Sequence, residues 1–171
     1  MLRAPISQAG STRRGMVAAQ VVLCLSVLMA MLAVVADGGL LLAERRHAQA
    51  TADAAALAAA SDLYENWSID NPSGTDSLGT AKSSALGVAS ANGYTNDGTT
   101  STVTVNISPA KYSGGPNAGT TLPLGYAEAT VTWYQQRFFG EIFGSGAIPV
   151  SARAVARGVQ VPAPPDFRLV E

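Results

Sequence analysis

The chain has 171 residues with a formal net charge of −1, and its only cysteine is Cys24. A single cysteine excludes an intramolecular disulfide, so the stability of the fold has to come from packing. After Asn66 the sequence carries seven acidic and six basic side chains, which leaves no cationic excess for binding nucleic-acid phosphates. We therefore expect one small globular domain in roughly the last hundred residues and no nucleic-acid partner.

The first element along the chain is a run of twenty-one residues without a charge, Met16 to Ala36, which we call the apolar segment. Apolar segments of about twenty residues span a bilayer, and a helix alone satisfies the backbone of a lone span. Arg13 and Arg14 precede it and Asp37 follows it, so these residues mark the expected membrane boundaries. We expect Asp37 to mark the lipid edge rather than to pair with a neighbouring subunit. The charge asymmetry favours a cytoplasmic N-terminus, residues 1–15 being a basic leader.

The same region also fits a cleaved secretory signal, because Val34 and Ala36 are small enough for a peptidase site after Ala36. The product would be a secreted adhesin or binding module. Secretory apolar cores usually run for about 7 to 15 residues, whereas this one is longer and passes into a second helical stretch. We therefore favour a retained single-pass anchor and keep secretion as the alternative.

The helix is expected to continue beyond the membrane. Neither proline nor glycine occurs from Leu40 to Glu65, and Ala48 to Ala60 contains nine alanines, the residue with the highest helix propensity. Residues 16–65 are thus predicted to form one helix, about half of which projects from the bilayer. Gly38 and Gly39 are the expected place for a bend.

Small apolar side chains recur at helical spacing on one face of the projecting part. Such side chains let another backbone approach closely, as in membrane helix pairs. The pattern predicts a close contact without identifying its partner, which can be a helix of another subunit or the chain's own domain. The residues of this alanine stripe are Ala48, Ala52, Ala55 and Ala59.

Residues 66–160 are predicted to form an exported α+β domain with a small antiparallel sheet and short helices. A helix is expected from Thr80 to Asn92, with Gly93 as its C-terminal cap. Three later segments alternate apolar and polar residues, as strands with one solvent-exposed face do, and Pro149 indicates that the third is an edge strand. The predicted strands cover residues 102–107, 126–134 and 148–156, and a proline-rich tail follows at 161–171.

A further short helix is predicted between the last two strands. Its apolar cluster could enter a membrane surface, but Arg137 is the only basic residue beside it, and interfacial helices usually carry more cations. We therefore expect the cluster to pack against the sheet. The helix covers residues 137–143, and the cluster consists of Phe138, Phe139, Ile142 and Phe143.

The chain offers little material for catalysis, which needs a reactive side chain and a partner that tunes it. His47 is the only histidine, and beside Arg45 and Arg46 it is expected to be solvated or to face lipid headgroups. No set of histidine, cysteine or carboxylate residues recurs at a metal-ligand spacing. We therefore expect no enzymatic activity, no cofactor, no metal and no small-molecule substrate.

Several features follow one another in order along the first third of the chain. They are Arg13-Arg14-Gly15, the apolar segment, Asp37-Gly38-Gly39, Arg45-Arg46 and the alanine-rich run Ala52 to Ala60. This series resembles the TadE/TadG-like proteins of bacterial tight-adherence (Flp-type) pilus systems. The resemblance implies a pilin-like chain in the bacterial inner membrane whose long N-terminal helix is both anchor and assembly surface. Its implied partners are the lipid bilayer and other pilus or secretion subunits.

The resemblance also bears on processing of the leader. In the pilin-like branch of the family a membrane peptidase cuts after a glycine, here Gly15, so that Met16 would become the first residue. That branch carries a glutamate at the fifth mature position, where this chain has Gln20, an amide of similar shape without the charge. The TadG-like branch often lacks the glutamate. The resemblance therefore implies an uncleaved, non-enzymatic component of a Flp-type pilus assembly or secretion apparatus.

Overall fold

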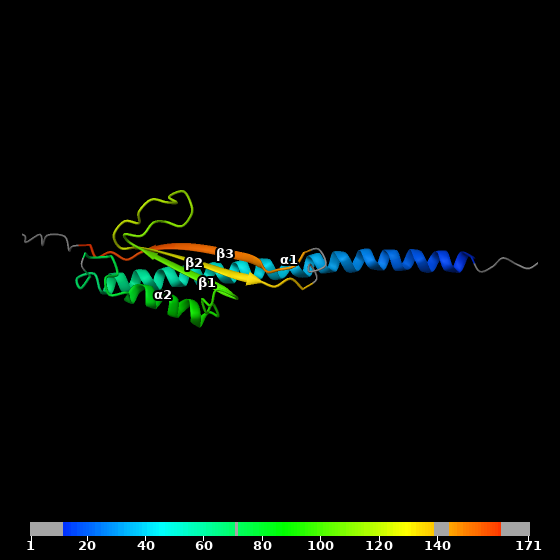
Figure 1. Cartoon of the computed structure of the whole chain (residues 1–171), viewed down its shortest axis with the longest axis horizontal. Coiled ribbons are helices and arrows are strands. Elements are labelled where there is room, and N and C mark those ends of the chain that lie inside the picture. The colour runs from blue at the N-terminus through cyan, green and yellow to red at the C-terminus, as the bar shows by residue number, and fades with distance from the viewer. Residues whose placement is uncertain (1–11, 71, 139–143, 162–171) are drawn as a thin grey trace, which may run out of the picture.

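A computed structural model shows a long helix with a sheet and a second helix packed along its C-terminal half (Figure 1). The structure describes residues 12–70, 72–138 and 144–161. Within these residues two helices are followed by three strands, which confirms the predicted α+β class. The elements are α1 (Thr12–Glu65), α2 (Thr80–Ala91), β1 (Ser101–Ile107), β2 (Tyr126–Gln135) and β3 (Ile148–Arg157).

α1 is one continuous helix of 54 residues, so the prediction of a single helix over residues 16–65 is confirmed. At 1.5 Å per residue it is about 80 Å long. The helix runs without a break through Gly38 and Gly39, where a bend was expected, and Figure 1 shows none. A side chain added at either glycine would meet nothing within 4 Å.

The three strands form an antiparallel sheet in the order β1-β2-β3. Val131 on the central strand pairs with Val103 on β1 and with Ala152 on β3. All three predicted strands are present, with ends that differ from the predicted ones by a single residue. β3, which contains Pro149, lies at an edge of the sheet as predicted, where a missing backbone donor is tolerated.

The sheet and α2 both pack against α1, so the C-terminal half of α1 is the centre of the domain (Figure 1). The core is unusually rich in alanine, which lets the backbones of these elements approach closely. All four residues of the alanine stripe have 0% exposure. The stripe therefore contacts the chain's own domain, the second of the two partners considered for it. Because the domain covers these side chains, they are not free to contact a helix of another subunit.

The end of α2 shows the predicted glycine cap. Gly93 has a φ of +92° and donates its N–H to the Ser90 carbonyl at 2.9 Å, while the Tyr94 N–H donates to the Ala89 carbonyl at 3.0 Å. This pair of bonds satisfies the last carbonyls of the helix and reverses the chain direction. The reversal turns Tyr94 into the core, where only 2% of it is exposed.

The predicted short helix at 137–143 lies largely outside the described residues, as do Phe139, Ile142 and Phe143 of its apolar cluster and residues 162–171 of the tail. Phe138 is described and is 65% exposed. For this residue the expected packing against the sheet is wrong. Phe138 lies beyond the last residue of β2, where the sheet has ended and offers no surface to cover it.

Candidate membrane anchor and its junction with the domain

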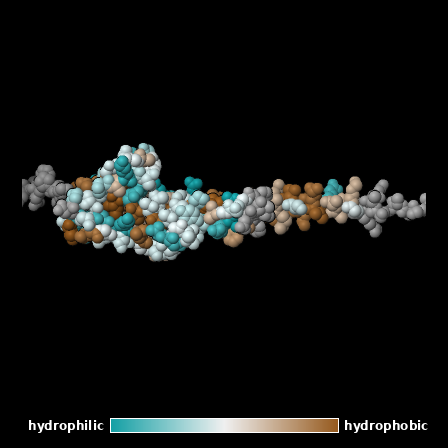
Figure 2. Space-filling view, in the orientation of Figure 1, coloured by the Kyte–Doolittle hydropathy of each residue, from teal (hydrophilic) through white to brown (hydrophobic). Residues whose placement is uncertain are grey.

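The apolar segment of α1 projects from the domain with its side chains uncovered. Its large apolar side chains are between 48% exposed, at Val27, and 76% exposed, at Met16. Figure 2 shows hydrophobic side chains along this projecting part of the helix. The twenty-one residues span about 31 Å, against about 30 Å for the hydrocarbon layer of a bilayer. By length and composition, α1 is therefore a candidate membrane span.

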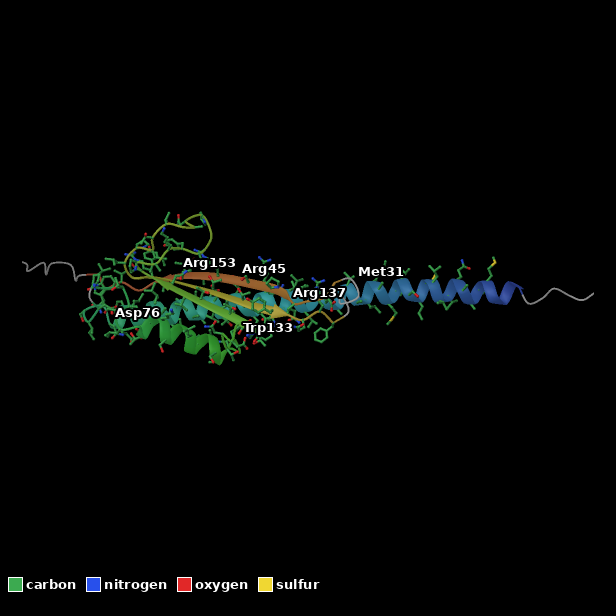
Figure 3. The ribbon with its side chains drawn as sticks, viewed as in Figure 1. Met31, Arg45, Asp76, Trp133, Arg137 and Arg153 are labelled. Atoms are coloured by element: carbon green, nitrogen blue, oxygen red, sulfur yellow. The ribbon has the colours of Figure 1, made fainter. Side chains whose placement is uncertain are left out.

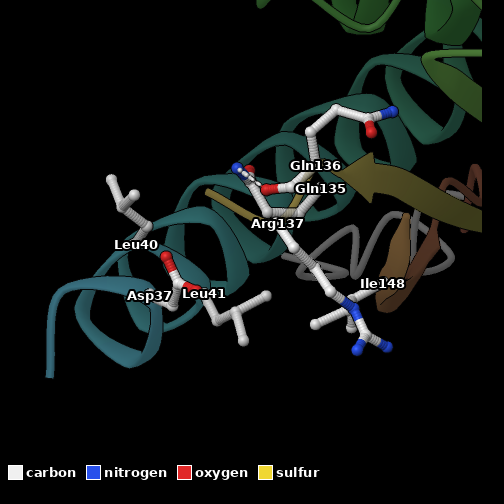
Figure 4. A pocket seen from close by; sticks show the side chains of 7 residues that line it. All are labelled: Asp37, Leu40, Leu41, Gln135, Gln136, Arg137 and Ile148. Carbon is white, nitrogen blue, oxygen red and sulfur yellow. Dashed lines mark hydrogen bonds between the residues drawn. The ribbon is translucent and has the colours of Figure 1, made fainter. Parts of the chain in front are cut away.

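The domain meets α1 directly beyond the apolar segment, at a set of residues that we call the junction. The end of β2 and the start of β3 lie beside the helix there and, together with it, line a partly open cavity of about 20 Å³ (Figure 4). Asp37, the expected boundary residue, is half-buried in this set. The sheet thus ends at the level where the uncharged run ends. The junction consists of Asp37, Leu40, Leu41, Gln135, Gln136, Arg137 and Ile148.

Basic side chains lie near the junction, and Figure 3 labels two of them, Arg45 and Arg137. Arg45 and Arg46 are exposed on α1 about one and a half turns beyond Leu40, and Arg137 is half-buried just past the end of β2. The Nε of Arg137 is buried, and none of the described residues accepts a hydrogen bond from it. Arg13 and Arg14, at the other end of the apolar segment, are helical, but their side chains lie outside the described part of the chain.

Just above the junction, a polar cluster joins α1 to the end of α2. The Tyr94 hydroxyl donates to Glu44 Oε1 at 2.6 Å, and His47 Nε2 lies 3.0 Å from the Asn92 carbonyl oxygen. Burial and the neighbouring Glu44 carboxylate raise the pKa of Tyr94 above its ordinary value. The Tyr94 ring also meets Trp133 edge-on, with centroids 5.8 Å apart. His47 therefore links the two helices, a role that the sequence did not indicate.

A second polar cluster lies on the outer face of the sheet, under the 108–125 loop that rises from the domain in Figure 1. Glu128 has 0% exposure and forms an ion pair with Arg153. It also accepts hydrogen bonds from Asn106 Nδ2 at 2.9 Å and from the Ser113 N–H at 2.7 Å. Burial alone would raise the pKa of Glu128, but these bonds outweigh it and lower the pKa. Arg153 also lies over the Tyr112 ring, so the cluster holds the loop against the sheet.

Neither polar cluster resembles a catalytic or metal centre. Within the described residues, no group of three or more histidine, cysteine or carboxylate side chains could hold a metal ion. The Glu128 carboxylate already has three partners within the chain, and the Glu44 carboxylate accepts from a tyrosine. In this structure these side chains hold one secondary-structure element against another.

The residues considered for processing lie at the far end of α1. Gly15, Met16 and Gln20 are helical and exposed, and a side chain added at Gly15 would meet nothing within 4 Å. The Gly15–Met16 bond is about 33 Å along the helix from Asp37, at 1.5 Å per residue. The fold thus separates the possible processing site from the domain by the whole apolar segment.

Comparisons with known proteins give one match, to the long helix. Neither the curated proteins nor the solved structures contain a match to this chain. The resemblance to TadE/TadG-like proteins is confirmed for α1: residues 15–62 match the family model described as "Putative Flp pilus-assembly TadE/G-like".

Proposed function

We propose that the protein is a membrane-anchored, non-enzymatic component of a Flp-type pilus assembly or a related secretion apparatus. The family match over residues 15–62 supports a role related to Flp pilus assembly, in a family of structural or assembly components. The long apolar helix supports membrane anchoring. In this proposal the N-terminus is cytoplasmic, the chain crosses the inner membrane once and the α+β domain is exported.

The observation that carries the proposal is the double use of α1. Its first half is an exposed apolar rod of bilayer length, and from Ala48 onward the same helix supplies the core of the domain. A helix without a break joins the two halves, so no flexible linker separates anchor and domain. Such a chain presents its domain at a fixed height and orientation next to the bilayer, as a scaffold component requires.

Contacts with other subunits are proposed to involve the apolar segment, because the alanine stripe is already covered by the domain. Without a hydrophobic driving force inside lipid, helix association depends on close packing and on interhelical hydrogen bonds. Gln20 is exposed on α1 and carries an amide that can form such a bond. A neighbouring transmembrane helix with a polar side chain at the same depth would be its partner.

The test is the fate of the intact chain in bacterial cells. Carbonate-washed membranes should retain the protein, and protease added to spheroplasts should degrade the domain while a fragment containing the apolar segment remains protected. Intact mass then separates the cases. A full-length chain supports a fixed anchor, whereas loss of residues 1–15 indicates pilin-like maturation. Recovery of the protein in the carbonate supernatant would refute the anchor.

The secreted binding module is the second candidate, and one observation favours keeping it. The fully buried residues of α1 begin at Ala48, eleven residues beyond Asp37, so a cut after Ala36 would remove none of them. The domain could therefore keep its core without the apolar segment. A released chain that lacks residues 1–36 would establish this alternative in the same mass measurement.

A further inference from the structure

We propose that the junction end of the domain binds an anionic lipid surface, with Arg137 contacting headgroup phosphates and Phe138 entering the bilayer interface. Arg45 lies about 13 Å beyond the apolar segment along α1, and because helical side chains point toward the helix N-terminus, its guanidinium extends back toward the same surface. This inference rests on the proposed membrane anchoring and adds a second membrane contact to it. The domain would then rest on the lipid instead of standing clear of it.

The first argument is the depth of the junction relative to the bilayer. Asp37 to Leu41 lie between about 1.5 and 8 Å beyond the last residue of the apolar segment, at 1.5 Å per residue. The headgroup layer on each side of a bilayer is about 5 to 8 Å thick, the difference between the total and hydrocarbon thicknesses. Arg137 lines the same small cavity as Asp37 and Leu41. With the apolar segment in the hydrocarbon, Arg137 is therefore at headgroup depth.

The second argument is the direction and chemistry of the Arg137 side chain. Within the described residues, no acceptor forms a hydrogen bond with its buried Nε. Figure 4 shows its side chain running past Ile148 and away from Asp37. A planar guanidinium matches the geometry of phosphate oxygens and forms charge-assisted hydrogen bonds with them. A lipid phosphate would accept hydrogen bonds from the terminal nitrogens of this guanidinium.

The third argument is the apolar residue that follows. Phe138 is 65% exposed, which is unfavourable in water for a large aromatic side chain, yet aromatic rings are readily accommodated between headgroups and acyl chains. Arg45 lines a groove that shares Leu41 and Ile148 with the cavity of Arg137. Two cations and an aromatic side chain thus lie around one end of the domain, next to the helix that enters the membrane.

An anionic lipid is the occupant that these observations favour over a soluble phosphate. The site adjoins the transmembrane helix, so lipid headgroups are present there at very high local concentration. Each juxtamembrane cation also contributes its own attraction to anionic lipids, so arginines on different elements can act together at one lipid surface. A soluble ligand would gain nothing from the position of Phe138.

The experiment uses the full chain in lipid nanodiscs made of phosphatidylcholine with increasing phosphatidylglycerol. Native mass spectrometry counts the phosphatidylglycerol molecules retained by the protein after release from the disc. The Arg137→Gln variant should bind phosphatidylglycerol with about fivefold lower affinity, which is the effect of losing one surface cation. Lys82→Gln is the matched control, since Lys82 is exposed on α2 away from the junction, and it should behave like the unchanged protein.

The depth of residue 138 in the bilayer is measured separately, in a chain whose native thiol is removed by Cys24→Ala. A fluorophore at Phe138→Cys should be quenched by lipids that carry a nitroxide near the headgroup. The same fluorophore at Val155→Cys, an exposed position further along β3, should not be quenched.

These measurements distinguish failure of the proposed membrane anchoring from failure of the proposed lipid contact. If the chain does not enter the discs at all, the anchoring proposal falls. If it enters but Arg137→Gln retains phosphatidylglycerol as the unchanged protein does, the lipid contact is refuted, and so it is if Phe138→Cys escapes quenching. Inorganic phosphate added to the discs that contain phosphatidylglycerol should not displace this lipid from the protein. Displacement would identify a soluble-phosphate site and overturn the inference.

Discussion

Replacing Ala55 by leucine tests whether the alanine stripe is the chain's own core. Ala55 has 0% exposure between α1 and the rest of the domain, so three added carbon atoms have no free space to occupy. Overpacking of a close-packed core costs about 1–3 kcal/mol. A loss of about 2 kcal/mol should lower the melting temperature of a domain of this size by roughly 8 °C.

The matched control is Ala50→Leu, because Ala50 is exposed on the same helix. A substitution of this kind on the surface changes stability by no more than about 0.5 kcal/mol. Thermal unfolding of the full chain in detergent can be followed through the emission of Trp67 and Trp133, its two tryptophans. The reasoning is refuted if both variants melt like the unchanged protein and Ala55→Leu instead loses its partner subunits, because the stripe would then be an intersubunit surface.

Further predictions concern single positions in the domain. A side chain at Gly158 would lie 1.7 Å from the Ala60 carbonyl oxygen on α1, so Gly158→Ala should destabilise the domain by about 3 kcal/mol in denaturant titration. A side chain at Gly87, in the middle of α2, would meet nothing within 4 Å, so Gly87→Ala should stabilise the domain by about 0.5–1 kcal/mol. If Gly158→Ala and Gly87→Ala changed stability equally, the proposed clash at Gly158 would be contradicted. The lowered pKa of Glu128 means that its contribution is complete above the ordinary value of 4.5 and is lost as the pH falls through the lower folded pKa. Stability measured against pH should therefore fall less steeply in acid for Glu128→Gln, at the cost of lower stability at neutral pH.

Much of the fold could be predicted because its elements follow strong local patterns. The long helix follows from alanine content and the lack of interruptions, and the strands follow from alternation that Pro149 assigns to an edge. The cap at Gly93 was also visible, since glycine accommodates the positive φ that ends a helix. The hydrogen bond between the next residue, Tyr94, and Glu44 could not be predicted, because it joins residues fifty positions apart.

Contacts between distant segments account for the remaining differences. An alanine face is equally suited to a neighbouring subunit and to the chain's own sheet, so the pattern alone left its partner open. Glu128 reads as a residue of a solvent-exposed strand face, and only the closing of the 108–125 loop buries it beside Arg153. Phe138 was expected to pack against the sheet because Arg137 is the only basic residue beside its cluster, whereas its exposure follows from where β2 stops.

The unbroken passage of α1 from the apolar segment into the domain also fixes an angle. With 3.6 residues per turn, each position advances the helix by about 100°. Inserting one residue at Gly38 would therefore rotate the sheet by that amount around the helix axis relative to Gln20, while raising it by only about 1.5 Å. The number of residues between the apolar segment and the core therefore sets the direction in which the domain faces around the helix axis.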